Sequence, residues 1–249
     1  MARYQVILAY DGAHFMGSQR QANSRTVQGE LEKALRKLGW SDRSVLIAGR
    51  TDAGVHASGQ VAAFDLEWSH ADEDLMRALN ASLPVDLAVR EARVVAADFH
   101  PRFDAVSRRY RYRLFSHPVR DPLREKTAWR TWPAVDGALL AQAASLLIGT
   151  HDFAAFGSPT GPMGTTVRTV MQAGWRPVEE DEWQFEIQAD AFLYRMVRRL
   201  VFVQAAFAQG RVSAQVVAKS LAGPAEVPAG ELPAGLAPAH GLTLVEVHY

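Results

Sequence analysis

The chain has 249 residues, 48% of them hydrophobic, which is enough for one large domain or two ordinary ones with a substantial core. Its 27 basic and 27 acidic side chains balance, which argues against a generally adhesive polycation, and the absence of cysteine excludes disulfides and thiolate metal sites. No run approaches the ~18 apolar residues of a membrane span, and the first residues do not resemble an apolar leader, so we expect a cytoplasmic protein with no membrane association.

The first half of the sequence predicts the element order β-α-β-β-α-β. Val27, Leu31 and Leu35 share one helical face, and Gly39 is a plausible helix stop. A second helix with the same kind of apolar spacing ends at Pro84. The predicted strands are 4–10, 45–49, 61–66 and 87–96, and the predicted helices are 26–39 and 72–83.

The second half repeats this order. Its predicted strands are 107–115, 167–176, 183–189 and 242–248, and its predicted helices are 136–149, 192–209 and a short 212–221. The Pro/Gly/Ala-rich segment 222–240 is expected to be a surface loop. The sequence therefore predicts an α+β fold of two ferredoxin-like halves, residues 1–104 and 105–249. Together the halves would form a mixed, mainly antiparallel sheet, with helices on one face and a central cleft.

The stretch GRTDAGVH at 49–56 places one carboxylate, Asp52, among small residues. Three interpretations stay open on the residues alone. Asp52 caps a turn or helix, or it shares a helical face with His56 as a pair of metal ligands. Alternatively, Asp52 is poised for covalent or acid–base chemistry, with the neighbouring Arg50 favouring its ionised form. Glycines in and after the stretch would let a bulky substrate approach the backbone.

The predicted strand SRRYRYRLF alternates basic and aromatic side chains. Arg109, Arg111 and Arg113 fall on one face, and the tyrosines fall on the other. The simplest interpretation is a half-buried strand with arginines in solvent and tyrosines in the core, which we expect of Tyr112. The functional interpretation is a basic face that contacts phosphates, beside an aromatic ring, Tyr110, that stacks on a base.

The predicted helix 192–209, which begins with FLYRMVRRLV, combines a core face with basic residues. Phe192, Met196 and Leu200 have helical spacing and fit the core. Arg195, Arg198 and Arg199 cannot all be buried. The eight histidines of the chain are scattered and form no recognisable metal-binding cluster.

Seven ordered stretches of the sequence resemble the bacterial tRNA pseudouridine synthase A family, and the resemblance covers nearly the whole chain. GRTDAGVH is the most specific of them. The matching stretches are YDG-x-x-F-x-G at 10–17, TVQGELEKAL at 26–35, GRTDAGVHASGQVAAF at 49–64, FHPRFDAVSRRYRY at 99–112, HDFAAF at 151–156, FLYRMVRRLV at 192–201 and the closing AHGLTLVEVHY.

The resemblance implies an isomerase that converts uridines of the tRNA anticodon stem-loop, at tRNA positions 38, 39 and 40, to pseudouridine without metal or organic cofactor. It implies a homodimer in which one tRNA contacts both subunits. The essential motif aspartate of the family corresponds to Asp52, its arginine partner to Arg50 and its active-site tyrosine to Tyr110. An arginine near the site corresponds best to Arg198. We expect Arg109 and Arg111 to bind substrate phosphates.

Two positions depart from the family pattern. Ser18 stands where the first motif usually has tryptophan, and Phe202 stands where a glycine is common. Both put local packing or RNA contact in question rather than activity. Two other functions compete with the isomerase: a non-catalytic RNA-binding protein on the same fold, and a metal-dependent hydrolase that uses Asp52 and His56.

Overall fold

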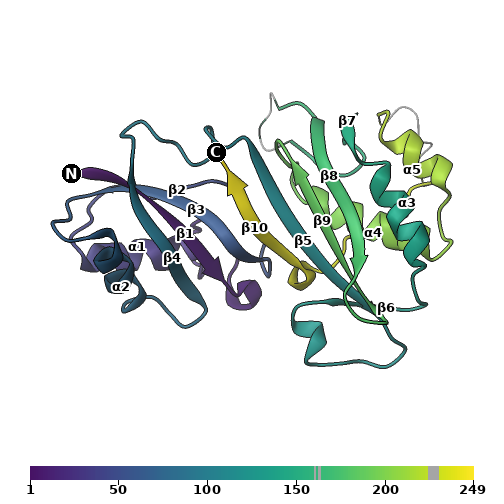
Figure 1. Ribbon diagram of the computed structural model, residues 1–249, viewed down its shortest axis with the longest axis horizontal. Helices are drawn as coiled ribbons and strands as arrows, with labels where there is room; N and C mark the ends of the chain where they lie inside the picture. The colour runs from purple at the N-terminus through teal and green to yellow at the C-terminus, as the bar shows by residue number, and fades with distance from the viewer. Residues whose placement is uncertain (160, 162–163, 224–229) are drawn as a thin grey trace. The chain divides into compact units, whose positions relative to one another are not determined.

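The computed structural model describes residues 1–159, 161, 164–223 and 230–249 (Figure 1). The chain divides into two compact units. The first contains Met1–Val106 together with Thr243–Tyr249, and the second contains Ser107–Leu242. The division differs from the predicted halves at one point, because the closing strand pairs with the first unit. Residues 224–229 of the predicted loop lie outside the described residues.

The first unit contains an antiparallel sheet in the order β4-β1-β3, which β10 extends by pairing parallel to β3. The short strand β2 pairs antiparallel with β3. Figure 1 shows helices α1 and α2 together on one face of these strands. The elements are β1 Ala2–Tyr10, α1 Val27–Lys37, β2 Leu46–Ile47, β3 His56–Leu66, α2 Asp72–Asn80, β4 Leu87–Val95 and β10 Leu242–His248.

The core of the first unit follows the alternation of β1. Tyr4, Val6, Leu8 and Tyr10 are all buried, because successive side chains of a strand point to opposite faces. Helix α1 covers this face with the apolar positions that the sequence predicts, and the side chain of Thr26 caps its first turn by accepting from an amide of the helix.

The second unit has an antiparallel sheet in the order β5-β9-β8-β7, with β6 pairing parallel to β5. The predicted second-half elements between 107 and 221 are all present, and β6 and β7 are additional. The elements are β5 Ser107–Ser116, β6 Trp129–Thr131, α3 Gly137–Ser145, β7 Gly149–Asp152, β8 Val167–Pro177, β9 Glu182–Ala189, α4 Met196–Ala208 and α5 Ala214–Ser220.

These elements confirm the predicted α+β class and the mixed, mainly antiparallel strand pairing. Three boundaries move appreciably, and one of them is the end of helix α3, which lies at Ser145 rather than at 149. Strand β3 begins at His56 rather than at 61, and helix α4 begins at Met196 rather than at 192. Among the described residues, no helix is long and apolar enough to cross a bilayer.

Candidate active site and the loop that carries Asp52

Asp52 lies on the connection between β2 and β3, where the backbone makes a tight turn. The amide of Val55 donates to the Asp52 carbonyl at 3.2 Å, and β3 begins at the next residue, His56. No helix follows Asp52 in this described segment, so the helix-cap interpretation is wrong. The carboxyl side chain is half-buried beside Thr51, which is buried.

The segment that follows β1 wraps closely around this turn. A Cβ on Gly12 would lie 2.0 Å from the Val55 carbonyl oxygen, and a Cβ on Gly17 would lie 2.8 Å from the Thr51 carbonyl oxygen. The Gly54 amide donates to the Phe15 carbonyl at 3.3 Å. Only glycine permits backbone contacts this close, so the two segments fix one another.

Ser18 fixes Thr51 from both sides. The Ser18 hydroxyl accepts from the Thr51 amide at 2.8 Å, and the Ser18 amide donates to the Thr51 carbonyl at 3.1 Å. Ser18 is completely buried. The family departure at this position therefore lies next to Asp52, as part of the support of its loop.

A second set of hydrogen bonds holds the Thr51 side chain. The Tyr10 hydroxyl lies 2.9 Å from Thr51 Oγ1. The Gln60 side chain donates to this Tyr10 hydroxyl at 3.4 Å and to the Gly49 carbonyl at 2.8 Å. Burial raises the pKa of Tyr10, so this hydroxyl keeps its proton for hydrogen bonding. Strands β1 and β3 thus both support the residue that precedes Asp52.

We expect Ser18→Ala to destabilise the protein by about 1–3 kcal/mol, because the buried Thr51 amide loses its acceptor. The loosened loop should lower kcat more than it raises KM for tRNA. Chemical denaturation and steady-state kinetics measure the two effects. Ser58→Ala, at an exposed position of β3, is the matched control. A Ser18→Ala protein with unchanged kcat would contradict the positioning role.

The metal-ligand interpretation of Asp52 and His56 loses its geometric basis. The two residues do not share a helical face, because one lies in the turn and the other begins β3. Nδ1 of His56 lies 3.1 Å from the Gly12 amide nitrogen, which donates to it, and the same distance from an oxygen of Asp11. Throughout the described ranges, no three His, Asp or Glu side chains are grouped to hold a metal ion. His56 therefore has a structural role in joining the segment after β1 to β3.

Arg50 is exposed, and no ion pair or hydrogen bond is recorded for it with the described residues. Its guanidinium does not come within ion-pair distance of the Asp52 carboxylate, although the two residues are close in sequence. The expected ion pair between Arg50 and Asp52 is therefore not formed in this structure. An exposed guanidinium at this place is instead available to a substrate.

Strand β5, in the second unit, has the alternation that its sequence predicts. Tyr110 is 9% exposed and meets Phe192 edge to face, with ring centroids 5.0 Å apart. Tyr112 is fully buried, as expected, and burial raises its pKa well above the ordinary value. Its hydroxyl donates to the Pro238 carbonyl at 2.8 Å.

The basic face of β5 is partly neutralised by strand β9. Arg111 contacts Glu186 at 3.0 Å, and Arg113 donates from Nε to the buried Glu182 at 2.7 Å. Arg109 is opposite Gln188 in the strand register and is half-buried. Arg111 and Arg113 thus already contact carboxylates, which weakens the phosphate-binding prediction for Arg111.

Arg198 lies in the first turn of α4, where it contacts Ala237 through both its side chain and its backbone. Its Nε donates to the Ala237 carbonyl at 2.8 Å, and the Ala237 amide donates to the Arg198 carbonyl at 3.2 Å. Phe202, the second family departure, packs where a Cβ on Gly235 would lie 2.4 Å from its ring. Phe202 therefore fills space that the glycine leaves open.

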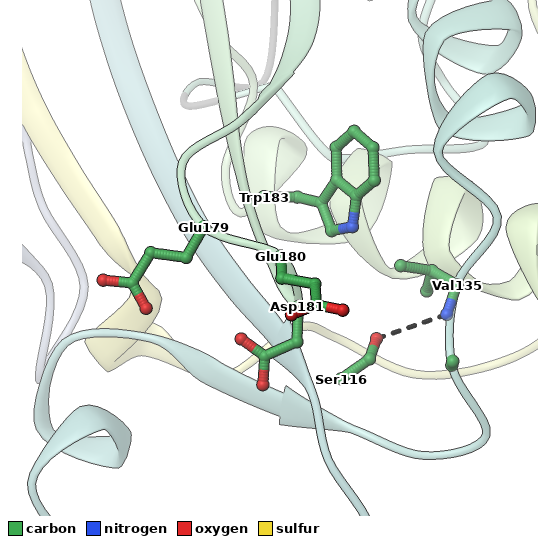
Figure 2. A pocket seen from close by; sticks show the side chains of 7 residues that line it. Ser116, Val135, Glu179, Glu180, Asp181 and Trp183 are labelled. Atoms are coloured by element: carbon green, nitrogen blue, oxygen red, sulfur yellow. Dashed lines mark hydrogen bonds between the residues drawn. The ribbon is translucent and has the colours of Figure 1, made fainter.

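A cavity of about 550 Å³ in the second unit is lined by acidic side chains, in contrast to the basic face of β5 (Figure 2). Glu179, Glu180 and Asp181 line the cavity together with Trp183, and in Figure 2 the Glu179 carboxyl extends away from the Trp183 indole. The Ser116 hydroxyl accepts from the Val135 amide at 3.2 Å. Arg124 contacts Asp181 and lowers the pKa of that carboxyl. The acidic lining is unsuited to a phosphate-bearing substrate.

The first unit thus holds a carboxylate on a rigid loop beside an exposed arginine, and the second unit holds a basic, aromatic strand. These features fit the class of enzymes that act on a nucleic acid. The chain belongs to the tRNA pseudouridine synthase family, whose model matches residues 6–104 and 143–249. Asp52 and Arg198 lie in the matched segments, whereas Tyr110, Arg109 and Arg111 fall between them.

Curated relatives named tRNA pseudouridine synthase A extend the match over the full chain. The relative from Chloroflexus aurantiacus strain J-10-fl is 41% identical, covering 100% of this chain and 89% of its own. The relative from Limosilactobacillus fermentum is 40% identical, covering 100% and 96%. The relative from Methylacidiphilum infernorum is 42% identical, covering 99% and 95%. The family resemblance of the sequence is confirmed.

Proposed function

We propose that this chain converts uridines of the tRNA anticodon stem-loop, at positions 38, 39 and 40, to pseudouridine. Membership of the family makes it an isomerase of tRNA uridines. The observation that carries the proposal for the site is the Asp52 loop, whose backbone is fixed by Gly12, Gly17 and Ser18. A group so held is preorganised for reaction.

Asp52 serves the reaction by one of two routes. In the first, a carboxylate oxygen bonds to C1′ of the ribose while the N1–C1′ bond breaks and its electrons pass to uracil N1. The freed uracil rotates, C5 bonds to C1′, and the ester bond to Asp52 breaks. The proton of C5 then leaves, and N1 takes up a proton.

In the second route, the Asp52 carboxylate removes the C2′ proton. The electrons of that bond form a C1′–C2′ double bond as the N1–C1′ bond breaks, which gives a glycal. C2′ then regains a proton as C5 bonds to C1′, the proton of C5 leaves, and N1 takes up a proton. Both routes require the carboxylate of Asp52, so neither changes its assignment.

The other predicted residues take supporting roles in this proposal. Tyr110 stacks on the uracil and accepts a proton at C5 or C2′. Arg50 fills or props the space that the flipped nucleotide vacates. Arg109 and Arg198 bind substrate, and Arg111 contributes less because Glu186 already contacts it.

Mapping of pseudouridine in tRNA treated with the pure protein tests the substrate proposal. We expect modification of uridines at positions 38, 39 and 40 in unmodified transcripts, and none in the D-loop or TΨC-loop of the same molecules. The map is read by chemical probing of pseudouridine. Modification confined to another stem-loop would contradict the proposal, while leaving the family membership intact.

We also propose that the enzyme acts as a homodimer in the cytoplasm. The family resemblance supports the dimer, and the cysteine-free composition is compatible with a reducing compartment. Sedimentation equilibrium of the purified chain determines the association state.

A further inference from the structure

A cavity of about 320 Å³ lies in the second unit, where the loop after β7 meets the start of α4. Two arginines and two aromatic side chains line it, and no carboxylate is among its described lining residues. The lining comprises Ala154, Ala155, Phe156, Gly157, Ser158, Tyr194, Arg195, Arg199 and Leu236. Its charge is therefore opposite to that of the acidic cavity beside Trp183.

The wall of this cavity is tightly built. The Tyr194 amide donates to the Ser158 carbonyl at 2.9 Å, and these two residues form an isolated antiparallel bridge. A Cβ on Gly157 would lie 2.7 Å from the Tyr194 carbonyl oxygen. The loop and the start of the helix are thus held at a fixed separation, because no residue larger than glycine fits between them.

Arg195 has an unusual backbone at this wall. Its φ of 62° is left-handed, and among the described residues it is the only non-glycine residue with a positive φ. Such a conformation is unfavourable for a side chain with a Cβ and is retained where the surroundings require it. The Arg195 side chain is exposed, and its guanidinium carbon lies 4.7 Å from the centre of the Tyr194 ring. The aromatic face thus orients the cation.

Arg199 brings a second cation to the same cavity. The Arg199 amide donates to the Arg195 carbonyl at 3.1 Å, so the two residues lie one helical turn apart on the same side of α4. Within the described residues, the Arg199 guanidinium donates through Nη1, to the carbonyls of Pro233 and Gly235. A guanidinium has five N–H donors, so this anchoring fixes Arg199 without consuming its capacity to bind an anion.

We propose that this cavity is a second RNA-binding site, in which Arg195 and Arg199 hold one backbone phosphate of the tRNA. Paired, preorganised guanidiniums bind phosphate oxygens strongly. The proposal rests on the proposed function, since tRNA is the phosphate-bearing molecule that the family acts on. Tyr194 is the positioning residue, because its ring orients Arg195.

Salt-dependent binding of a tRNA transcript tests this site. Each lost phosphate contact lowers the slope of log K against log salt by roughly 0.7–0.9. We expect Arg195→Asn to lower the slope by about that amount, and to weaken binding more at low salt than at high salt. Asparagine tolerates the left-handed backbone, so this variant removes the charge without added strain. Arg195→Lys should keep the slope.

The measurements are made in an Asp52→Asn background, so that the RNA stays unmodified during binding. Arg77→Asn is the control, because Arg77 is an exposed arginine on α2 that contacts Asp74. An unchanged slope for Arg195→Asn, or an equal decrease for Arg77→Asn, would overturn the proposal. The proposal would also be overturned if inorganic phosphate alone bound saturably at micromolar concentration and this binding was lost in Arg195→Asn, while the tRNA slope stayed unchanged. That result would indicate a site for free phosphate rather than for RNA. Failure of the proposed function is detected separately, as an absence of pseudouridine at tRNA positions 38, 39 and 40 after treatment with the unsubstituted protein.

Discussion

Asp52→Asn is expected to abolish the release of tritium from tRNA that carries uridine labelled at C5. Asparagine keeps the shape of the side chain but can neither attack C1′ nor remove the C2′ proton. Loss of the reacting group should lower kcat by at least roughly a thousandfold. The affinity for tRNA should change by no more than about twofold, because many phosphate contacts dominate binding.

Asp42→Asn is the matched control for this experiment, since Asp42 is an exposed aspartate that precedes β2. It should leave both turnover and binding unchanged. Retained turnover in Asp52→Asn would contradict the assignment of Asp52 as the catalytic residue. A parallel loss of tRNA affinity would show that the substitution disturbs the RNA-binding surface rather than the chemistry.

Gly12→Ala is expected to damage both stability and activity. The added Cβ would lie 2.0 Å from the oxygen, 2.4 Å from the carbon and 2.9 Å from the nitrogen of the Val55 backbone. A backbone cannot yield as a side chain does, so the turn that carries Asp52 must move. We expect a loss of about 1–3 kcal/mol in the free energy of unfolding. A displacement near 1 Å should lower kcat by roughly a hundredfold.

Gly174→Ala provides the comparison. Gly174 lies in β8, and a Cβ there meets nothing within 4 Å. Its free energy of unfolding should stay within about 0.5 kcal/mol of the unsubstituted protein. Denaturant unfolding and tritium release are measured for both variants at a temperature where each is folded. Equal behaviour of the two would show that the close contact at Val55 can relax.

Elements with strong local periodicity were predictable from the sequence. The face of α1 defined by Val27, Leu31 and Leu35 is buried as expected, and so is the face of β5 that carries Tyr112. Gly39, the predicted stop, takes a φ of +90°. In these segments the local pattern and the tertiary environment favour the same structure.

Other features depend on residues far apart in the sequence and could not be predicted. Near its start, strand β3 has the small residues 57–59, which have little strand preference. Gly59 lets the backbone of Val245 approach, since a Cβ on Gly59 would lie 2.1 Å from the Val245 carbonyl oxygen. The hydrogen bond of Ser18 to Thr51 spans 33 residues. A periodicity argument also extended α4 too far toward its N-terminus, because apolar residues continue through the loop that ends at Arg195.

The pairing of β10 with β3 has a consequence for biosynthesis. Residues 243–249 complete the sheet of a unit whose other residues are 1–106. The His248 carbonyl accepts from the Val106 amide at 2.8 Å, and the Tyr249 hydroxyl donates to the Pro101 carbonyl at 2.8 Å. The ribosome makes the Asp52 loop early, but the sheet that supports it closes only after residues 243–249 have emerged. A nascent chain released before that point would keep an unpaired edge on β3, where another chain can add a strand.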